Sequence, residues 1–196
     1  MLKVGAIVLA AGFSSRMGEN KLLLKASGEC MIVTTVSQLV RANLREVIVV
    51  TGHQREEIER ALRGCMVRFA SCDDFSRGMG RSLAVGINAL SKELDGALIC
   101  LGDMPFVKIN QIEAVIRTFE GHDGGVIVAP IHDGRRGHPV LFPQTCFMAM
   151  AKLDTDAGAR DIIYANRDIL IELEIDSADV LKDVDDPVVA KQWGYK

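Results

Sequence analysis

Residues 4–25 read VGAIVLAAGFSSRMGENKLLLK, and this stretch decides the fold. Its first part, residues 4–9, is an uninterrupted apolar run, which is typical of a strand buried on both faces of a parallel sheet. The run then gives way to small residues, with two glycines and two serines. Such a composition lets the backbone approach an anion closely. The stretch therefore predicts a buried strand followed by a loop that holds phosphates.

Two charged side chains strengthen this prediction, because Arg16 and Lys21 can neutralise phosphate oxygens. The loop is not a Walker A motif, since five residues separate Gly12 from Gly18 and Lys21 lies three residues further on. It is not a dinucleotide-binding fingerprint either. A Gly/Ser-rich surface loop with incidental charges remains the alternative at this point.

Beyond this stretch, strand-like and helix-like segments alternate. We expect further strands at 46–50, 66–70, 97–101, 126–129, 139–142 and 169–174, and helices at 31–43, 54–63, 81–90, 110–119 and 159–166. This alternation predicts an α/β fold, a Rossmann-like three-layer αβα sandwich with a mostly parallel sheet. With 196 residues, no repeat and no linker-like tract, the chain is expected to form a single domain over residues 1–196. Ligands of such sheets bind beyond the carboxyl ends of the strands.

Composition excludes several classes of function. A net charge of −3 argues against nucleic acid as the main partner. No apolar run approaches the roughly 18 residues of a transmembrane helix, so we expect a soluble, cytoplasmic protein. The chain has no C-x-x-C pair and no H-x-x-x-H spacing, which disfavours zinc and disulfides. The cysteines are Cys30, Cys65, Cys72, Cys100 and Cys146.

An aspartate follows the predicted buried strand at 97–101, in the sequence Gly102-Asp103-Met104-Pro105. The proline forces a turn, which leaves Asp103 at the ligand-binding edge of the sheet. Mg²⁺ prefers carboxylate, water and phosphate oxygens, so Asp103 is a candidate metal ligand. The alternative is that Asp103 caps the next helix.

Four other segments carry candidate residues, and each has a purely structural alternative. The acidic run at 183–187, DVDDP, is by itself a turn and helix N-cap. Residues 78–83, GMGRSL, are either a plain helix start or an anion site at a helix N-terminus. Residues 134–140, GRRGHPV, and 156–160, DAGAR, are either solvated charged turns or a binding surface for an anionic substrate.

Together and in order, these motifs resemble those of the MobA-like nucleotidyltransferases, and most of all the branch of molybdenum cofactor cytidylyltransferases. The resemblance implies catalytic roles for Arg16, Lys21 and Asp103. It implies a Mg²⁺ site at Asp103 and Asp185, with Asp183 in support. The second substrate would be bound by Arg136, His138, Asp156 and Arg160. The nucleotide would be bound by Leu9, Ala10, Ala11, Gly12, Ser15, Arg16, Gly18, Lys21, Gly78 and Ser82.

The implied reaction is transfer of CMP from CTP to the terminal phosphate of molybdopterin (molybdenum) cofactor, with release of pyrophosphate. A molybdoenzyme of the xanthine dehydrogenase type would receive the product. Ala11 favours CTP, since the guanylyltransferase branch tends to have glycine there. Three alternatives remain: use of GTP, another small phosphorylated acceptor, or a non-catalytic carrier of the cofactor.

Overall fold

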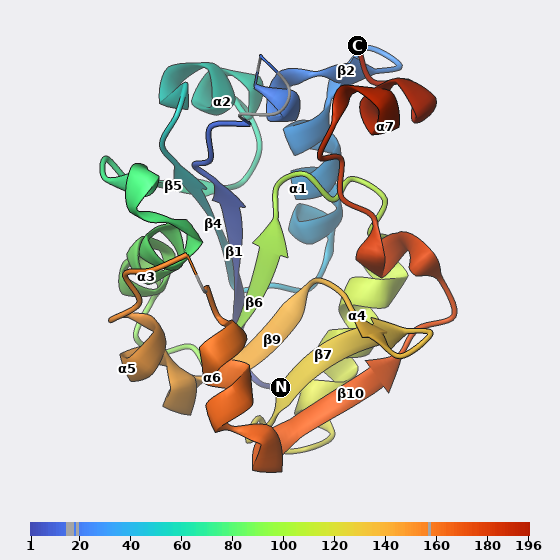
Figure 1. Cartoon of the computed structure of the whole chain (residues 1–196). Helices are drawn as coiled ribbons and strands as arrows, with labels where there is room; N and C mark the ends of the chain where they lie inside the picture. Colours follow the sequence, from blue (N-terminus) through green and yellow to red (C-terminus); the bar gives the residue numbers. More distant parts are fainter. Residues whose placement is uncertain (15–17, 19, 157) are drawn as a thin grey trace.

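The computed structural model, which describes residues 1–14, 18, 20–156 and 158–196, is built on an eight-stranded sheet (Figure 1). Among the described strands of this sheet, only β9 and β8 run antiparallel to their neighbours. The strands lie in the order β10 (Leu170–Glu174), β7 (Ile127–His132), β9 (Val140–Pro143), β6 (Gly96–Leu101), β1 (Val4–Ala10), β4 (Glu46–Thr51) and β5 (Arg68–Ser71), and β8 (Arg135–Arg136) pairs with β7.

Helices cover both faces of the sheet and form two hydrophobic cores. One core is made with α1 (Met31–Arg41), α2 (Arg55–Ala61), α4 (Ile109–Glu120) and α7 (Pro187–Gln192). The other is made with α3 (Met79–Ala89), α5 (Phe147–Met150) and α6 (Arg160–Ala165). The predicted three-layer αβα sandwich with a mostly parallel sheet is confirmed.

The apolar run of β1 explains why this strand is central. Val4, Ala6 and Val8 enter one core, whereas Ile7 enters the other. Successive side chains of a strand point to opposite faces, so a strand covered on both sides needs apolar residues at every position. β4 and β6 flank β1 in parallel register and show the same continuous burial.

The structure differs from the sequence-based expectations mainly at element ends and in short elements. The helix predicted at 31–43 ends at Arg41, and the one predicted at 159–166 spans Arg160–Ala165. The hairpin of β2 (Lys25–Ala26) and β3 (Glu29–Cys30), the strand β8 and the short helix α5 were not predicted. Two- to four-residue elements carry too little periodicity to show in a sequence.

No helix among the described residues is both long and apolar enough to cross a membrane.

The carboxyl ends of the parallel strands meet at one edge of the sheet, where β1, β4 and β6 each end in a loop (Figure 1). Two backbone hydrogen bonds tie these loops together. His53 N–H donates to the Ala11 carbonyl at 3.1 Å, and Gly102 N–H donates to the Leu9 carbonyl at 3.0 Å. The three loops therefore form one rigid rim, and the candidate site lies there.

Candidate active site

Three charged side chains from distant parts of the chain meet at this rim. The Lys21 Nζ lies 2.5 Å from Asp103 Oδ2 and 2.5 Å from Asp185 Oδ1. The Lys21 and Asp103 side chains are only 14% and 16% exposed, whereas Asp185 is 41% exposed. Because water is largely excluded from the first two, their interaction is stronger than that of a surface ion pair.

Lys21 is held in place by its neighbours in the chain. It opens a short 3₁₀ turn capped by Asn20, whose Oδ1 accepts a hydrogen bond from Leu22 N–H at 3.2 Å. Leu22 and Leu24 are buried in the core. The Lys21 N–H donates to Ser14 Oγ at 3.3 Å, which fixes the start of the turn against the loop that follows β1. The apolar residues of the KLLL sequence thus anchor the backbone that presents the ammonium group.

Asp103 is positioned by the turn that follows β6. Thr35 of α1 donates its hydroxyl hydrogen to the Gly102 carbonyl at 3.0 Å, and Gly102 N–H is bonded to β1. The turn is tight, since a Cβ at Gly102 would lie 3.1 Å from the Leu9 carbonyl oxygen. The N-cap of α4 is Lys108, so Asp103 is not a helix cap.

Asp185 reaches the site from the C-terminal part of the chain. Val184, fully buried, donates its N–H to the Asp103 carbonyl at 3.1 Å and so pins this segment beside the β6 turn. Asp186 takes the capping role expected for the acidic run, since its Oδ1 accepts from Val188 N–H at 2.8 Å. Loss of solvent and the neighbouring carboxylates of Asp185 and Asp103 raise the pKa of Asp183.

The charge of Lys21 is secured by its partners. Burial by itself lowers the pKa of the ammonium group, but the charges and hydrogen bonds of Asp103 and Asp185 outweigh burial. The pKa of Lys21 therefore lies above its ordinary value, and the group is a full cation at neutral pH.

The three charged groups line one end of a pocket of about 460 Å³. Along the sheet edge the pocket extends from the end of β6, past the loop after β1, toward β4 and β5. Its other end is aromatic: the rings of Phe13 and Phe75 have centroids 4.7 Å apart, and His53 lies 5.2 Å from Phe13. Phe13 is 52% exposed. The pocket is thus charged at one end and lined by aromatic rings at the other.

Phe75 reaches this position because Gly52 has no side chain. A Cβ at Gly52 would lie 2.7 Å from the Phe75 ring and 2.9 Å from the Cβ of Ala11. The ring therefore packs directly on the backbone at the end of β4.

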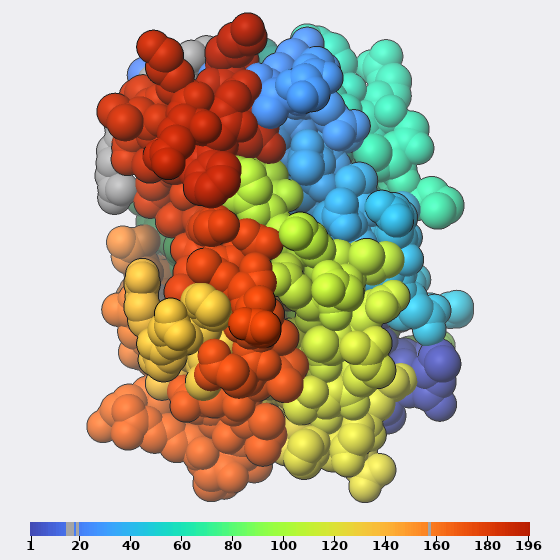
Figure 2. Space-filling model, turned by 90° about the vertical axis from the view of Figure 1, so that its right-hand side faces the viewer, coloured from blue at the N-terminus to red at the C-terminus, as the bar shows by residue number. Residues whose placement is uncertain are grey.

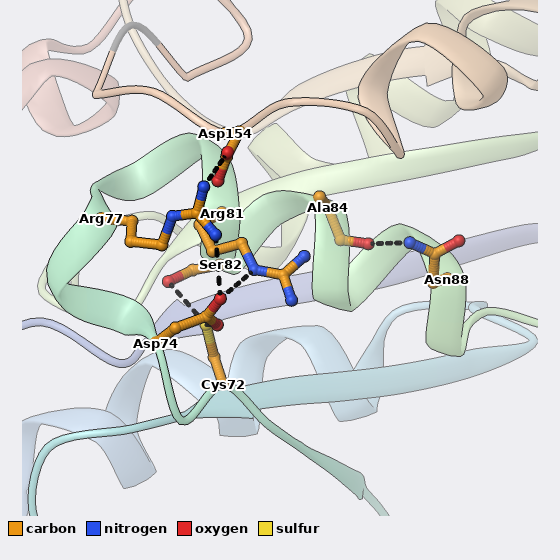
Figure 3. A network of polar contacts seen from close by, with 8 residues as sticks. All are labelled: Cys72, Asp74, Arg77, Arg81, Ser82, Ala84, Asn88 and Asp154. Carbon is orange, nitrogen blue, oxygen red and sulfur yellow. Dashed lines mark hydrogen bonds and ion pairs between the residues drawn. The ribbon is translucent and has the colours of Figure 1, made fainter.

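The N-terminus of α3 forms another wall, packed against residues 153–156. A Cβ at Gly80 would lie 2.4 Å from the Thr155 carbonyl oxygen, which accepts a hydrogen bond from Gly80 N–H at 2.9 Å. Figure 3 shows the ion pairs beside this contact: Arg77 with Asp154, and Arg81 with Asp74, the latter at 2.7 Å. The glycines of GMG are thus required by the close approach of another loop.

Of the four residues predicted for the second substrate, only Asp156 lines this pocket. It accepts a hydrogen bond from Met79 N–H at 3.4 Å. Arg136 is exposed on β8 and pairs with Glu172 of β10 at 2.8 Å. His138 lies behind the Asp103 turn, with its Nδ1 3.5 Å from the Ile99 carbonyl oxygen. Arg160 begins α6 and is exposed.

Burial lowers the pKa of His138, although the Ile99 carbonyl and the charge of Asp103 act in the opposite direction. The ring is therefore neutral at pH 7 and can offer a hydrogen bond to a ligand, but not a charge.

The sequence comparison decides the family: residues 6–169 match the MobA-like NTP transferase domain. The chain belongs to this family. The matched range contains Lys21 and Asp103 but ends before Asp185, which joins the site through the fold.

Relatives of this MobA-like chain include the molybdenum cofactor cytidylyltransferase of Escherichia coli (strain K12). It is 26% identical over 188 residues, which cover 95% of this chain and 93% of the relative. A solved homologue of Mycobacterium tuberculosis Rv0371c, from Mycobacterium sp. strain JC1, has a TM-score of 0.86 at 25% identity and covers 96% and 93% of the two chains. Rv0371c in complex with manganese has a TM-score of 0.81 at 23% identity over 98% of each chain, which shows the same fold.

Most of the predicted nucleotide-binding residues of this MobA-like domain line the one pocket. Ser15 and Arg16 lie outside the described residues, and Gly18 does not line the pocket. The predicted nucleotide-binding residues that line the pocket are Leu9, Ala10, Ala11, Gly12, Lys21, Gly78 and Ser82. Asp103, Asp156 and Asp185, which were predicted for other roles, line it as well. Their roles in binding remain predictions.

Sequence reasoning missed several pocket residues, namely Phe13, Ser14, Leu22, Phe75, Ser76, Met79 and Leu101. One signal could have revealed Phe13: a large apolar side chain between the glycines of a polar loop has no core to enter. Phe75 had no comparable signal, because its place depends on Gly52 of another strand.

Proposed function

We propose that the protein is a CTP:molybdenum cofactor cytidylyltransferase that depends on Mg²⁺. The observation that carries this proposal is the meeting of Lys21, Asp103 and Asp185 at one end of a pocket whose other end is aromatic. A nucleoside triphosphate has the matching form, with a polyanionic chain at one end and a flat base at the other.

The two carboxylates fit a divalent cation. One ammonium group lies 2.5 Å from an oxygen of each, so a single cation can contact both Asp103 and Asp185. Carboxylate oxygens are the ligands that Mg²⁺ and Mn²⁺ prefer. No group of three His, Cys, Asp or Glu side chains that could hold a metal occurs among the described residues, so phosphate and water would supply the other ligands. The manganese complex of Rv0371c supports this choice.

We place the triphosphate at the charged end, along the loop after β1. Lys21 would bind the phosphates there, and Asp103 and Asp185 would hold the metal ion. The base would lie at the end lined by Phe13 and Phe75, where an aromatic ring can stack on it. Backbone N–H groups near Gly78 would face its polar edge.

The reaction requires placement and charge more than proton transfer. A terminal phosphate is an anion near pH 7, so its oxygen can attack the α-phosphorus without a dedicated general base. As that bond forms, the bond from the α-phosphorus to the oxygen of the β-phosphate breaks, and pyrophosphate leaves with the electron pair. When bound, the metal ion would stabilise the developing charge. Lys21 would stabilise the charge of the leaving pyrophosphate, and Asp103 would help to hold the metal ion.

The choice of acceptor rests on the E. coli relative, whose match spans almost all of both chains. The acceptor would approach from the β6 and β9 side, where the neutral His138 lies close behind Asp103. A molybdoenzyme of the xanthine dehydrogenase type would receive the product.

Pyrophosphate release tests the proposal. The purified protein is given CTP, GTP, ATP or UTP with Mg²⁺, with and without molybdenum cofactor. We expect release with CTP only when the cofactor is present. Release with GTP instead would correct the base, and release that needs another phosphorylated acceptor would correct the second substrate. Cofactor binding without any nucleotide binding would support a carrier in place of an enzyme.

A further inference from the structure

Three carboxylates of the described residues line the pocket, and Asp156 lies apart from the other two. No three His, Cys, Asp or Glu side chains of the described residues could hold a metal together, so Asp156 is not a third ligand beside Asp103 and Asp185. Asp185 belongs to the C-terminal segment, drawn in red in Figure 2 against the blue segment that holds β2 and the yellow-green segment that follows β6. Asp156 instead precedes α6 and reaches the pocket beside the start of α3.

Asp156 is adjacent to the turn that carries Phe75. Gly78 N–H donates to the Phe75 carbonyl at 3.2 Å, and a Cβ at Gly78 would lie 2.9 Å from the backbone of Asp156. Met79 N–H donates to Asp156 Oδ1 at 3.4 Å, which is long for such a bond and leaves the carboxylate free to bind a second donor. The carboxylate therefore lies beside the aromatic end of the pocket.

The carboxylate of Asp156 has no cationic partner in the part of the chain that the structure describes. The two other aspartates around this contact are neutralised, Asp154 by Arg77 and Asp74 by Arg81 (Figure 3). Asp156 is exposed, so water can reach its oxygens. A nucleoside bound beside it displaces this water, and a carboxylate, which only accepts hydrogen bonds, then requires a donor on the ligand.

We propose that Asp156 selects cytosine by accepting a hydrogen bond from the 4-amino group of the base. The inference rests on the proposed function, which places the base at this end of the pocket. Cytosine has an N–H₂ donor at that position, whereas uracil has a carbonyl oxygen, which a carboxylate repels. A triphosphate offers no donor either, so the same carboxylate favours the orientation in which the phosphates lie at the other end.

The test is the binding of CTP and of UTP, each with Mg²⁺, measured by isothermal titration calorimetry on the purified protein. We expect the wild-type protein to bind CTP at least about tenfold more tightly than UTP, as for the gain of one hydrogen bond to a charged group. Asp156→Asn should abolish or invert this preference, because its amide can donate to the 4-oxygen of uracil. Asp156→Ala, which can neither donate nor accept, should bind the two nucleotides with similar Kd.

Asp154→Asn is the matched control. It removes a carboxylate from the same segment, but Asp154 pairs with Arg77 and does not line the pocket. Any effect of this change on the wall should weaken CTP and UTP alike and leave the ratio of their Kd values unchanged. If Asp156 only caps α3, Asp156→Asn should also leave that ratio unchanged, since Asn and Asp cap helices about equally well.

Other outcomes would overturn the inference. Equal affinity of the wild-type protein for CTP and UTP would do so. A loss in Asp156→Asn that is the same for CTP and UTP but absent with 2′-deoxy-CTP would assign the carboxylate to the ribose. An Asp156→Asn protein that binds both nucleotides normally and has only a higher KM for the acceptor would assign it to the second substrate. A wild-type protein that binds no nucleoside triphosphate would instead contradict the proposed function.

Discussion

At the scale of the residue, the site is defined by what Lys21 touches. Its ammonium group bridges two carboxylates at 2.5 Å each, and these carboxylates raise its pKa despite burial. The ion cluster therefore lies at the end of the pocket where we propose that metal and triphosphate bind. On substrate binding, Lys21 would exchange the two carboxylates for phosphate oxygens, and the carboxylates would exchange Lys21 for the metal ion. No charged group would then be left without a partner of opposite charge.

Asp103→Asn removes the charge of the less exposed carboxylate while it keeps the shape of the side chain. We expect turnover to fall by at least about a hundredfold, because charge stabilisation of this kind is usually the largest catalytic contribution. Pyrophosphate release measures the effect. Cys100→Ser, three residues away in β6, should leave the chemical step unchanged. An active Asp103→Asn protein would contradict the metal assignment.

Phe13→Ala tests the aromatic end of the pocket. Phe13 is 52% exposed and stands beside Phe75, so its ring is available to a base. Loss of a stacking contact of about 1 kcal/mol raises the Kd for CTP about fivefold. Isothermal titration calorimetry measures this change. Inorganic tripolyphosphate, which has no base, is expected to bind both proteins equally, and an equal weakening of both ligands would exclude stacking.

At the scale of the element, the start of α3 shows how two distant segments make one wall. Gly78 and Gly80 allow the helix to touch residues 153–156, and the pairs Arg77–Asp154 and Arg81–Asp74 lie around that contact (Figure 3). This contact fixes the position of Asp156, which lines the pocket and accepts a hydrogen bond from Met79 N–H. A glycine that resembles a ligand-binding residue in the sequence thus has a packing role in the structure.

Gly80→Ala should force the two segments apart, because the new Cβ would lie 2.4 Å from the Thr155 carbonyl oxygen. We expect a loss of about 1–3 kcal/mol in the free energy of unfolding. Urea denaturation measures it. Gly125→Ala is the control, since its Cβ would meet only ordinary contact at 3.7 Å. If the two variants were equally stable, residues 153–156 would be able to move away from the new Cβ at no cost in stability.

At the scale of the whole molecule, the two cores protect most of the thiols. All five cysteines, each within the described part of the chain, are free. Cys72, Cys100 and Cys146 are buried, while Cys30 and Cys65 are half-buried. Burial raises the pKa of each of the three buried thiols. A raised pKa reduces the thiolate fraction at any pH below it, so these thiols react slowly.

A thiol reagent such as DTNB at pH 8 should therefore modify Cys30 and Cys65 first. The three buried cysteines are expected to react only as the protein unfolds, and mass spectrometry of digested samples assigns each site. Raising the pH toward 10 should not expose them while the fold persists, because access is limited by burial as well as by the pKa. Rapid labelling of Cys100 in the native protein would contradict the packing of β6.

The sequence by itself determined the layers of the fold. An apolar run at residues 4–9 is typical of a strand covered on both sides, and the alternation that follows predicts a mostly parallel sheet, as the structure has. It also determined the position of Asp103, because a residue after a buried parallel strand must lie at the binding edge. These features depend on local pattern, which neighbouring residues are enough to define.

Only the tertiary structure decided how residues far apart in the chain meet. Lys21 and Asp185 are 164 positions apart, and the buried Val184, whose N–H donates to the Asp103 carbonyl, brings the Asp185 segment to the site. Phe75 enters the pocket because Gly52 of another strand leaves room for its ring. His138 is placed behind the Asp103 turn, and Arg136 beside Glu172, by the antiparallel return of the chain through β8 and β9. Such contacts depend on packing between elements, and no local pattern encodes them.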